Sequence, residues 1–156
     1  MTATISRPKI SNWETSNIPN LTGKTALITG ANSGLGYYTA KALAEKNAHV
    51  VIACRSLEKA NQTIKKLKGL NPEGIFTPLE LDLSDLKNIV EVQSKIFDNF
   101  ENLDLLINNA GIMHPPKTLS AQGYEIQFAV NHLAHMLLTL KLLPIIEKKE
   151  ESRIVT

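Results

Sequence analysis

Short apolar runs alternate with amphipathic stretches along this chain from residue 24 onward. The apolar runs have the length and β-branched content of strands that are buried on both faces of a sheet. Such strands are predicted at residues 25–29, 50–54, 75–81, 103–107 and, at the end of the chain, 153–156. The amphipathic stretches have the apolar spacing of helices. Four helices are predicted: one at 35–46, one that begins after a cap at Ser56, one that begins after a cap at Ser84, and one from 123 to about 143 that ends near Pro144.

This regular alternation predicts how the elements connect. Strand–helix–strand order implies parallel strands that are joined by right-handed crossovers. The predicted fold class is therefore α/β, a doubly wound parallel sheet of the Rossmann type that is incomplete after the start of its fifth strand. Residues 1–22 are polar, contain two prolines and are predicted to form an N-terminal arm, whereas residues 23–156 are predicted to form one domain. The first helix is expected to bury one face, made of Leu35, Tyr38, Thr39, Ala42 and Leu43.

Composition narrows the class of protein further. With 156 residues, 43% hydrophobic and 21% charged, the chain has the length and balance of one globular domain. A net charge of +2 is too small to indicate nucleic acid or an anionic membrane as the main partner. One cysteine, Cys54, excludes an internal disulfide and a multi-cysteine zinc site. The most apolar stretch, 128–146, carries too many polar residues for a membrane span, and a cytoplasmic protein is predicted.

A glycine-rich loop joins the first predicted strand to the first predicted helix, with the letters Thr-Gly-Ala-Asn-Ser-Gly-Leu-Gly at 29–36. A phosphate approaches a backbone closely only where side chains are absent, and the first turn of a helix offers free N–H groups. Gly30 is expected to permit the tight turn, Gly34 the close approach, and Gly36 the packing of helix on strand. A purely structural turn is the alternative. The dinucleotide-binding residues predicted in this loop are Gly30, Asn32, Ser33, Gly34, Leu35 and Gly36.

The glycine spacing and a second motif resemble one enzyme family. Gly-x-x-x-Gly-x-Gly, together with Asn-Asn-Ala-Gly at 108–111, is similar to the short-chain dehydrogenase/reductase family, from about residue 21 to residue 156. The letters at 53–60 and 130–135 most resemble its retinol dehydrogenase-like and protochlorophyllide reductase-like branches. The resemblance implies an oxidoreductase acting on the carbonyl/alcohol group or a double bond of a small-molecule substrate. The resemblance also leaves open that the protein forms a homo-oligomer.

The end of the second predicted strand bears on the choice of cofactor. NAD sites usually carry an acidic residue there, which binds the ribose 2′-hydroxyl. This strand ends instead in Cys54-Arg55-Ser56, and a guanidinium can pair with a 2′-phosphate. We therefore predict NADP(H), selected by Arg55, with a solvated surface arginine as the alternative.

The resemblance also assigns residues at the next two strand ends. It implies that Asp82 accepts a hydrogen bond from the adenine amino group, with Leu83 beside it, although a turn or cap residue is the alternative for Asp82. It further implies that Asn109, Ala110 and Gly111 lie along the cofactor ribose. Asn108 is expected to tie neighbouring strands together.

The family's catalytic residues are matched only in part. Asn131 corresponds to the family's helical Asn that orders a water relay, with a helix kink or a packing hydrogen bond as the alternative role. The family's Ser and its Tyr-x-x-x-Lys pair have no counterpart in the sequence up to Thr156. The one literal Tyr-x-x-x-Lys match, Tyr37 to Lys41, is taken as a coincidence because it lies beside the phosphate loop. The chain is therefore expected to be C-terminally truncated, and inactive by itself.

No metal site is predicted, and other functions stay open. His114, His132 and His135 lack the i, i+4 spacing with a partnering Glu, and the last two are expected to face solvent or an interface. A non-catalytic nucleotide-binding short protein, or the remnant of a truncated gene, is the alternative function. A methyltransferase-like domain shares the glycine loop, but the Asn-Asn-Ala-Gly segment and the missing acidic residue argue against it.

Overall fold

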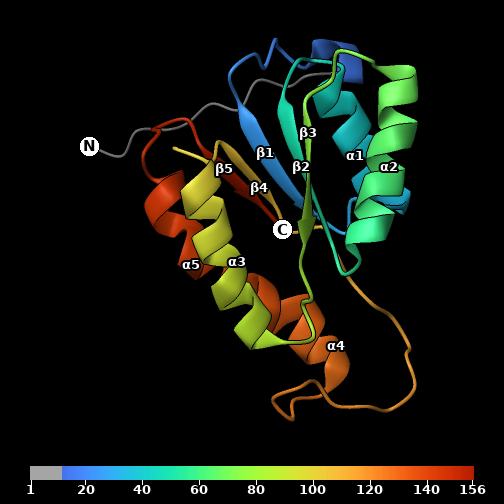
Figure 1. Cartoon of the computed structure of the whole chain (residues 1–156), viewed down its shortest axis with the longest axis vertical. Coiled ribbons are helices and arrows are strands. Elements are labelled where there is room, and N and C mark those ends of the chain that lie inside the picture. Colours follow the sequence, from blue (N-terminus) through green and yellow to red (C-terminus); the bar gives the residue numbers. More distant parts are fainter. Residues whose placement is uncertain (1–11) are drawn as a thin grey trace.

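Five parallel strands form one sheet in the order β3-β2-β1-β4-β5 (Figure 1). The computed structural model describes residues 12–156. The strands are β1 (Thr25–Thr29), β2 (His49–Cys54), β3 (Phe76–Glu80), β4 (Leu105–Ile107) and β5 (Arg153–Val155). In register, Leu27 of β1 lies opposite Val51 on one side and Leu106 on the other. The order reverses at β1, so the predicted doubly wound parallel sheet is confirmed.

Helices cover both faces of this sheet, with α1 and α2 on one face and α3 and α5 on the other (Figure 1). The helices are η1 (Thr15–Asn17, 3-10), α1 (Gly34–Ala44), α2 (Leu57–Leu70), α3 (Leu86–Asn99), α4 (Ile126–Phe128), η2 (Ala129–Leu133, a π-helical turn) and α5 (Ala134–Ile146). Because both faces are covered, the inner strands have continuous apolar runs, residues 26–28 of β1 and 50–54 of β2, rather than alternating apolar and polar positions.

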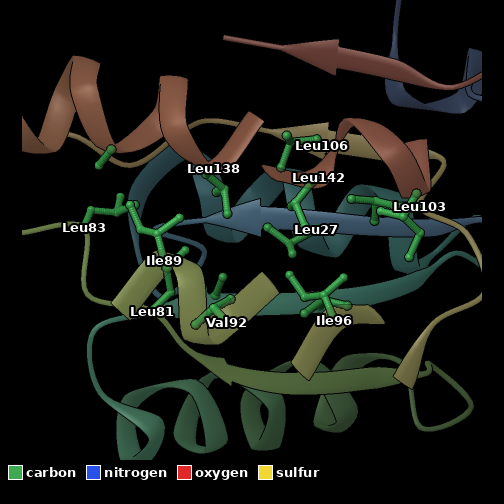
Figure 2. Close-up of a cluster of buried hydrophobic side chains, with 14 of the residues drawn as sticks. Leu27, Leu81, Leu83, Ile89, Val92, Ile96, Leu103, Leu106, Leu138 and Leu142 are labelled. Atoms are coloured by element: carbon green, nitrogen blue, oxygen red, sulfur yellow. The ribbon is translucent and has the colours of Figure 1, made fainter. Parts of the chain in front are cut away.

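Alternate residues of β1 and β2 enter two separate cores. Leu27 and Val51 pack with Ile89 and Ile96 of α3 and with Leu138 and Leu142 of α5; all of these except Val51 are labelled in Figure 2. On the opposite face, the buried side chains come from β1, β2, α1 and α2, and include Ala26, Ile28, Val50, Ile52, Ala40, Leu43, Ala60 and Leu67. Burying one such Leu or Ile contributes about 1.5–3 kcal/mol, so these two cores hold the strand ends in place.

Helix α1 buries a different face from the one expected. Gly36, Ala40, Leu43 and Ala44 face the sheet, whereas Leu35 is 81% exposed. Tyr38 is also exposed. Three of these four buried residues are Gly or Ala, so the size of the apolar side chains does not decide which face of α1 is buried. Of the expected set, Leu43 alone is fully buried.

The helix ends differ in part from the predictions. Ser56 caps α2 as expected, since its Oγ accepts a hydrogen bond from the Lys59 N–H at 3.3 Å. The cap of α3 is Asp85 and not Ser84, because the Asp85 carboxylate accepts from the Lys87 N–H at 2.9 Å. Ser84 instead donates to the preceding aspartate. The last helix runs on to Ile146, so that Pro144 lies within its final turn.

The stretch from Ile126 to Ile146 combines α4, η2 and α5. Among residues 12–156 it is the one helical stretch whose length and composition would allow it to cross a membrane. Ala134, Leu138 and Leu142 of α5 are nonetheless fully buried against α3 and the sheet. Those side chains belong to the core of the domain.

The first 22 residues are only partly described, because residues 1–11 of the predicted arm lie outside the described part of the chain. The rest of the arm contacts the end of α1, where the Ser16 carbonyl accepts from Lys46 Nζ at 2.8 Å. The Leu21 N–H donates to the Lys46 carbonyl at 2.7 Å. The boundary at residue 22 stays a prediction.

Candidate functional site

The glycine loop meets the segment after β4 at the carboxyl edge of the sheet. Gly30 has a φ of +66°, and a Cβ on it would lie 2.9 Å from the Ala110 Cα. A Cβ on Gly36 would lie 2.5 Å from Asn109 Nδ2 and 2.6 Å from the Gly30 carbonyl oxygen. Gly36 therefore packs closely against the glycine loop and Asn109. Gly34, with a φ of +55°, has no atom within 4 Å of its ideal Cβ position, so the space before the helix is open.

Thr29 joins these two loops through its buried side chain. Its Oγ1 accepts hydrogen bonds from the backbone N–H groups of Asn109 and Ala110, each at 3.0 Å. Its carbonyl accepts from Asn109 Nδ2 at 2.9 Å. No role for Thr29 is predicted from the sequence. A polar residue that ends an otherwise apolar strand is the signal that could have indicated one.

A cavity of about 260 Å³ opens at this edge and is lined by most of the predicted cofactor-binding residues. Its lining includes Gly30, Asn32, Arg55, Asp82, Leu83, Ala110 and Gly111. An adjoining hollow is lined by Gly30, Asn32, Ser33, Leu35, Asn109, Ala110 and Gly111. The ends of four strands, β1 to β4, thus contribute to one site, because parallel strands place their carboxyl ends at the same edge. Gly34 and Gly36 shape the loop without lining either space.

Asp82 holds the turn that follows β3. Its Oδ1 accepts from the Ser84 N–H at 2.9 Å and from the Ser84 hydroxyl at 2.6 Å. Its own N–H donates to Asn88 Oδ1 at 2.8 Å. Asp82 therefore has the turn role that was the alternative to binding adenine. This role uses one of its two carboxylate oxygens. Asp82 lines the cavity together with Arg55, which is exposed at the rim.

The segment from residue 112 to residue 125 begins at Ile112, which lines this cavity, and is fixed near both ends. Near its start, the His114 N–H donates to Gln127 Oε1 at 3.1 Å. Near its end, Gln122 Oε1 accepts from the Leu86 N–H at 3.0 Å, and Gln122 Nε2 donates to Asp85 Oδ1 at 2.6 Å. The Gln122 hydrogen bond lowers the pKa of the Asp85 carboxyl below its usual value, so that the accepting carboxylate is favoured.

Asn131 lies in the π-helical turn and bonds to the backbone of Ile112. Its Nδ2 donates to the Ile112 carbonyl, and its Oδ1 accepts from the Ile112 N–H, both at 2.9 Å. The alternative role, a packing hydrogen bond at a helix irregularity, therefore describes what this side chain does here. The catalytic role stays a prediction.

His135 is only 4% exposed, so the expectation that it faces solvent or an interface is wrong. Its Nε2 lies 3.0 Å from Thr29 Oγ1, and its Nδ1 lies 3.2 Å from the Asn131 carbonyl oxygen. A π-helical turn contains more residues than an α-helical one, which changes the face on which the following residues lie. Burial lowers the pKa of His135, and the hydrogen bond to Asn131 partly opposes this effect.

Other candidate groups stay apart from the site. Tyr37 and Lys41 both belong to α1, and Lys41 forms an ion pair with Glu45 at 3.1 Å on the same helix. Within residues 12–156, no three His, Cys, Asp or Glu side chains come close enough together to hold a metal ion.

Comparison with known families matches this architecture. A model of the short chain dehydrogenase family covers residues 24–156. The chain belongs to the short chain dehydrogenase family. This short chain dehydrogenase is 42% identical over 133 residues to human retinol dehydrogenase 13, covering 85% of this chain and 40% of that protein. It is 38% identical to human retinol dehydrogenase 11, covering 96% of this chain and 47% of the relative. The predicted retinol dehydrogenase-like character is thereby confirmed, and the chain spans less than half the length of these curated relatives.

Solved structures give the same result. An uncharacterised protein from Mycobacterium paratuberculosis superimposes with a TM-score of 0.77 at 38% identity, covering 87% of this chain and 47% of that one. A short chain dehydrogenase from Escherichia coli CFT073, crystallised with NADPH, gives a TM-score of 0.75 at 26% identity, covering 86% and 58%. The RhlG/NADP complex of Pseudomonas aeruginosa gives 0.73 at 27% identity, covering 86% and 52%.

Proposed function

We propose that residues 23–156 bind NADP(H) and form the cofactor-binding portion of an oxidoreductase. The observation that carries this proposal is the close contact of Gly30 after β1 with Ala110 after β4, beside a cavity that the ends of β2 and β3 also line, with the exposed Arg55 at its rim. Two structural neighbours were crystallised with NADPH or NADP, which supports the same assignment.

The residues of the cavity fit such a cofactor. The open space at Gly34 and the free N–H groups that begin α1 suit a pyrophosphate, flanked by the other residues of the glycine loop. These flanking residues are Gly30, Asn32, Ser33, Leu35 and Gly36. The Arg55 guanidinium suits a 2′-phosphate at the exposed rim.

The adenine and ribose positions follow from the same cavity. Asp82 has its second carboxylate oxygen, Oδ2, unengaged among residues 12–156, and it would accept from the adenine amino group beside Leu83. Asn109, Ala110 and Gly111 would lie along the ribose, held in place by Thr29.

When bound, the nicotinamide would exchange a hydride with the carbonyl/alcohol group or the double bond of a small molecule. Asn131 is the one catalytic residue that we assign here, and the 156 residues hold no counterpart of the family's Ser and Tyr-x-x-x-Lys. We therefore expect this chain by itself to bind cofactor without turnover. A cytoplasmic location and a homo-oligomer belong to the same proposal.

A ligand titration of the 156-residue chain tests the assignment. Calorimetry with NADP⁺, NAD⁺ and S-adenosylmethionine should give saturable binding of NADP⁺ that is tighter than binding of NAD⁺. The K68A variant changes an exposed lysine in the last turn of α2 and should behave like the parent chain. Binding of S-adenosylmethionine without NADP⁺ would establish the methyltransferase-like alternative and overturn the proposal.

A further inference from the structure

Two buried polar side chains from distant parts of the chain, Thr29 and His135, lie within hydrogen-bond distance of each other, and the His135 ring also meets the backbone of Asn131. Thr29 ends β1, Asn131 lies in the π-helical turn, and His135 follows in α5, 106 residues after Thr29. The imidazole of His135 lies between the other two, with Nε2 at 3.0 Å from the threonine hydroxyl and Nδ1 at 3.2 Å from the Asn131 carbonyl oxygen. The site as proposed above gives His135 no role.

The partners of this ring assign its tautomer. A carbonyl oxygen can only accept, so the proton must lie on Nδ1, facing Asn131. Nε2 is then an acceptor, and the Thr29 hydroxyl must donate to it. That hydroxyl has its lone pairs directed to two fixed donors, the N–H groups of Asn109 and Ala110. Its other acceptor, the Ile107 carbonyl, lies farther away, at 3.5 Å.

We propose that neutral His135 is a positioning residue for the cofactor site. Through the Thr29 hydroxyl it orients the amides of Asn109 and Ala110, and proton uptake by the ring weakens cofactor binding. This inference rests on the proposed function, because it takes those amides to border the bound cofactor.

Protonation conflicts with the hydrogen-bond pattern around Thr29. A proton on Nε2 would point at an oxygen that already receives two N–H groups, and a hydroxyl oxygen has no third lone pair to offer. The hydroxyl would have to turn to the more distant carbonyl, and at least one bond to Asn109 or Ala110 would lengthen. The effect would reach the cavity through the backbone of Ala110, which lines it.

His135 lines a cavity of about 200 Å³ with Asn108, Asn131, His132, Met136, Thr139, Ile154 and Thr156. Within the described chain, this lining holds two other titratable groups. One is His132, which is exposed and stacks on Phe128 at 5.4 Å between ring centroids. The other is the terminal carboxylate that Thr156 carries in the 156-residue chain, and it is present equally in the parent chain and in both variants named below. Strands β1, β4 and β5 present the uncharged Thr29, Asn108 and Ile154 to this region.

The direction of the pH dependence follows from burial. Burial holds the pKa of His135 below its usual 6.5, so the folded protein binds this proton less readily than the unfolded chain. The stability associated with the neutral ring is complete above about pH 6.5 and is lost as the pH falls through the lower folded value. Cofactor binding should weaken over the same interval.

The first experiment is an NMR titration of the 156-residue chain without cofactor. Ring ¹⁵N shifts should show the Nδ1–H tautomer of His135 at pH 7.5. Between pH 7.5 and 5, the amide signals of Asn109 and Ala110 should move together with the His135 ring, at a midpoint below that of a free histidine. An Nε2–H tautomer, or amides that do not follow the ring, would overturn the inference without any variant.

The second experiment measures NADP⁺ affinity by calorimetry across the same pH range in the parent chain, H135Q and H132Q. The amide of H135Q can accept from Thr29 and does not titrate. Relative to H135Q, the parent should lose several-fold more affinity between pH 7.5 and 5.5, and H132Q should match the parent. Equal profiles for the parent and H135Q would overturn the inference. If the parent binds no NADP⁺ at any pH, the proposed function fails, and the NMR titration still decides whether His135 positions the two amides.

Discussion

A Cβ atom on Gly30 would stand 2.9 Å from the Cα atom of Ala110. The two residues follow different strands, β1 and β4, which lie side by side in the sheet. Their contact leaves no room for a side chain at position 30, and it fixes the separation of the two loops that border the cavity.

The G30A variant should therefore lose about 2–4 kcal/mol of unfolding free energy, because a left-handed backbone at a residue other than glycine costs about 1–3 kcal/mol and the contact adds to this. Urea unfolding followed by circular dichroism measures this loss of unfolding free energy. G23A is the matched control, since Gly23 has a φ of +76° and no atom within 4 Å of its Cβ position. Equal losses in the two variants would show that the contact with Ala110 adds nothing.

Arg55 should set the preference for NADP over NAD. R55D places a carboxylate where the 2′-phosphate is proposed to bind, so NADP⁺ affinity should fall by roughly 10- to 100-fold, the range expected for lost charged hydrogen bonds. NAD⁺ affinity should fall much less or rise. K68D makes the same charge change at an exposed position of α2 and tests for a long-range effect of charge. An unchanged NADP⁺/NAD⁺ ratio in R55D would show that Arg55 is a solvated surface residue.

Asp104 should stabilise the amino edge of the sheet. Its buried carboxylate accepts from the Thr25 N–H and from Asn102 Nδ2, each at 2.9 Å, and pairs with Lys24 Nζ at 3.0 Å. D104A leaves the Thr25 N–H without this partner and should cost about 2–4 kcal/mol in chemical unfolding. K24M should cost clearly less, because the lysine is partly exposed and its ion pair is screened by water. Similar losses in both variants would show that the ion pair, and not the backbone hydrogen bond, dominates.

Gln122 should restrain the segment from residue 112 to residue 125. Q122A removes the acceptor of the Leu86 N–H and the donor to Asp85, so the segment should open more often. The rate of limited tryptic cleavage after the exposed Lys117 should rise several-fold, as followed by mass spectrometry. Q62A removes an exposed bond within α2 and should leave that rate unchanged. A rate in Q122A equal to the parent's would show that other contacts hold the segment.

The sequence by itself determined the sheet, the glycine loop and the family. Each of these depends on residues that are close together in the sequence, since a strand covered on both faces needs a continuous apolar run and a left-handed turn favours glycine. Residues 25–29 became β1 with the predicted bounds. Arg55 and Asp82 reached the cavity because the carboxyl ends of parallel strands share one edge.

Tertiary structure alone decided which polar groups meet and which helix faces are buried. The bond between His135 and Thr29 joins positions 106 residues apart, and no local pattern specifies such a pair. Leu35 of α1 is exposed, whereas the small residues Gly36 and Ala40 of the same helix are buried. Periodicity fixes the spacing of apolar residues in a helix, whereas the shape of the surface it meets fixes which of them are buried.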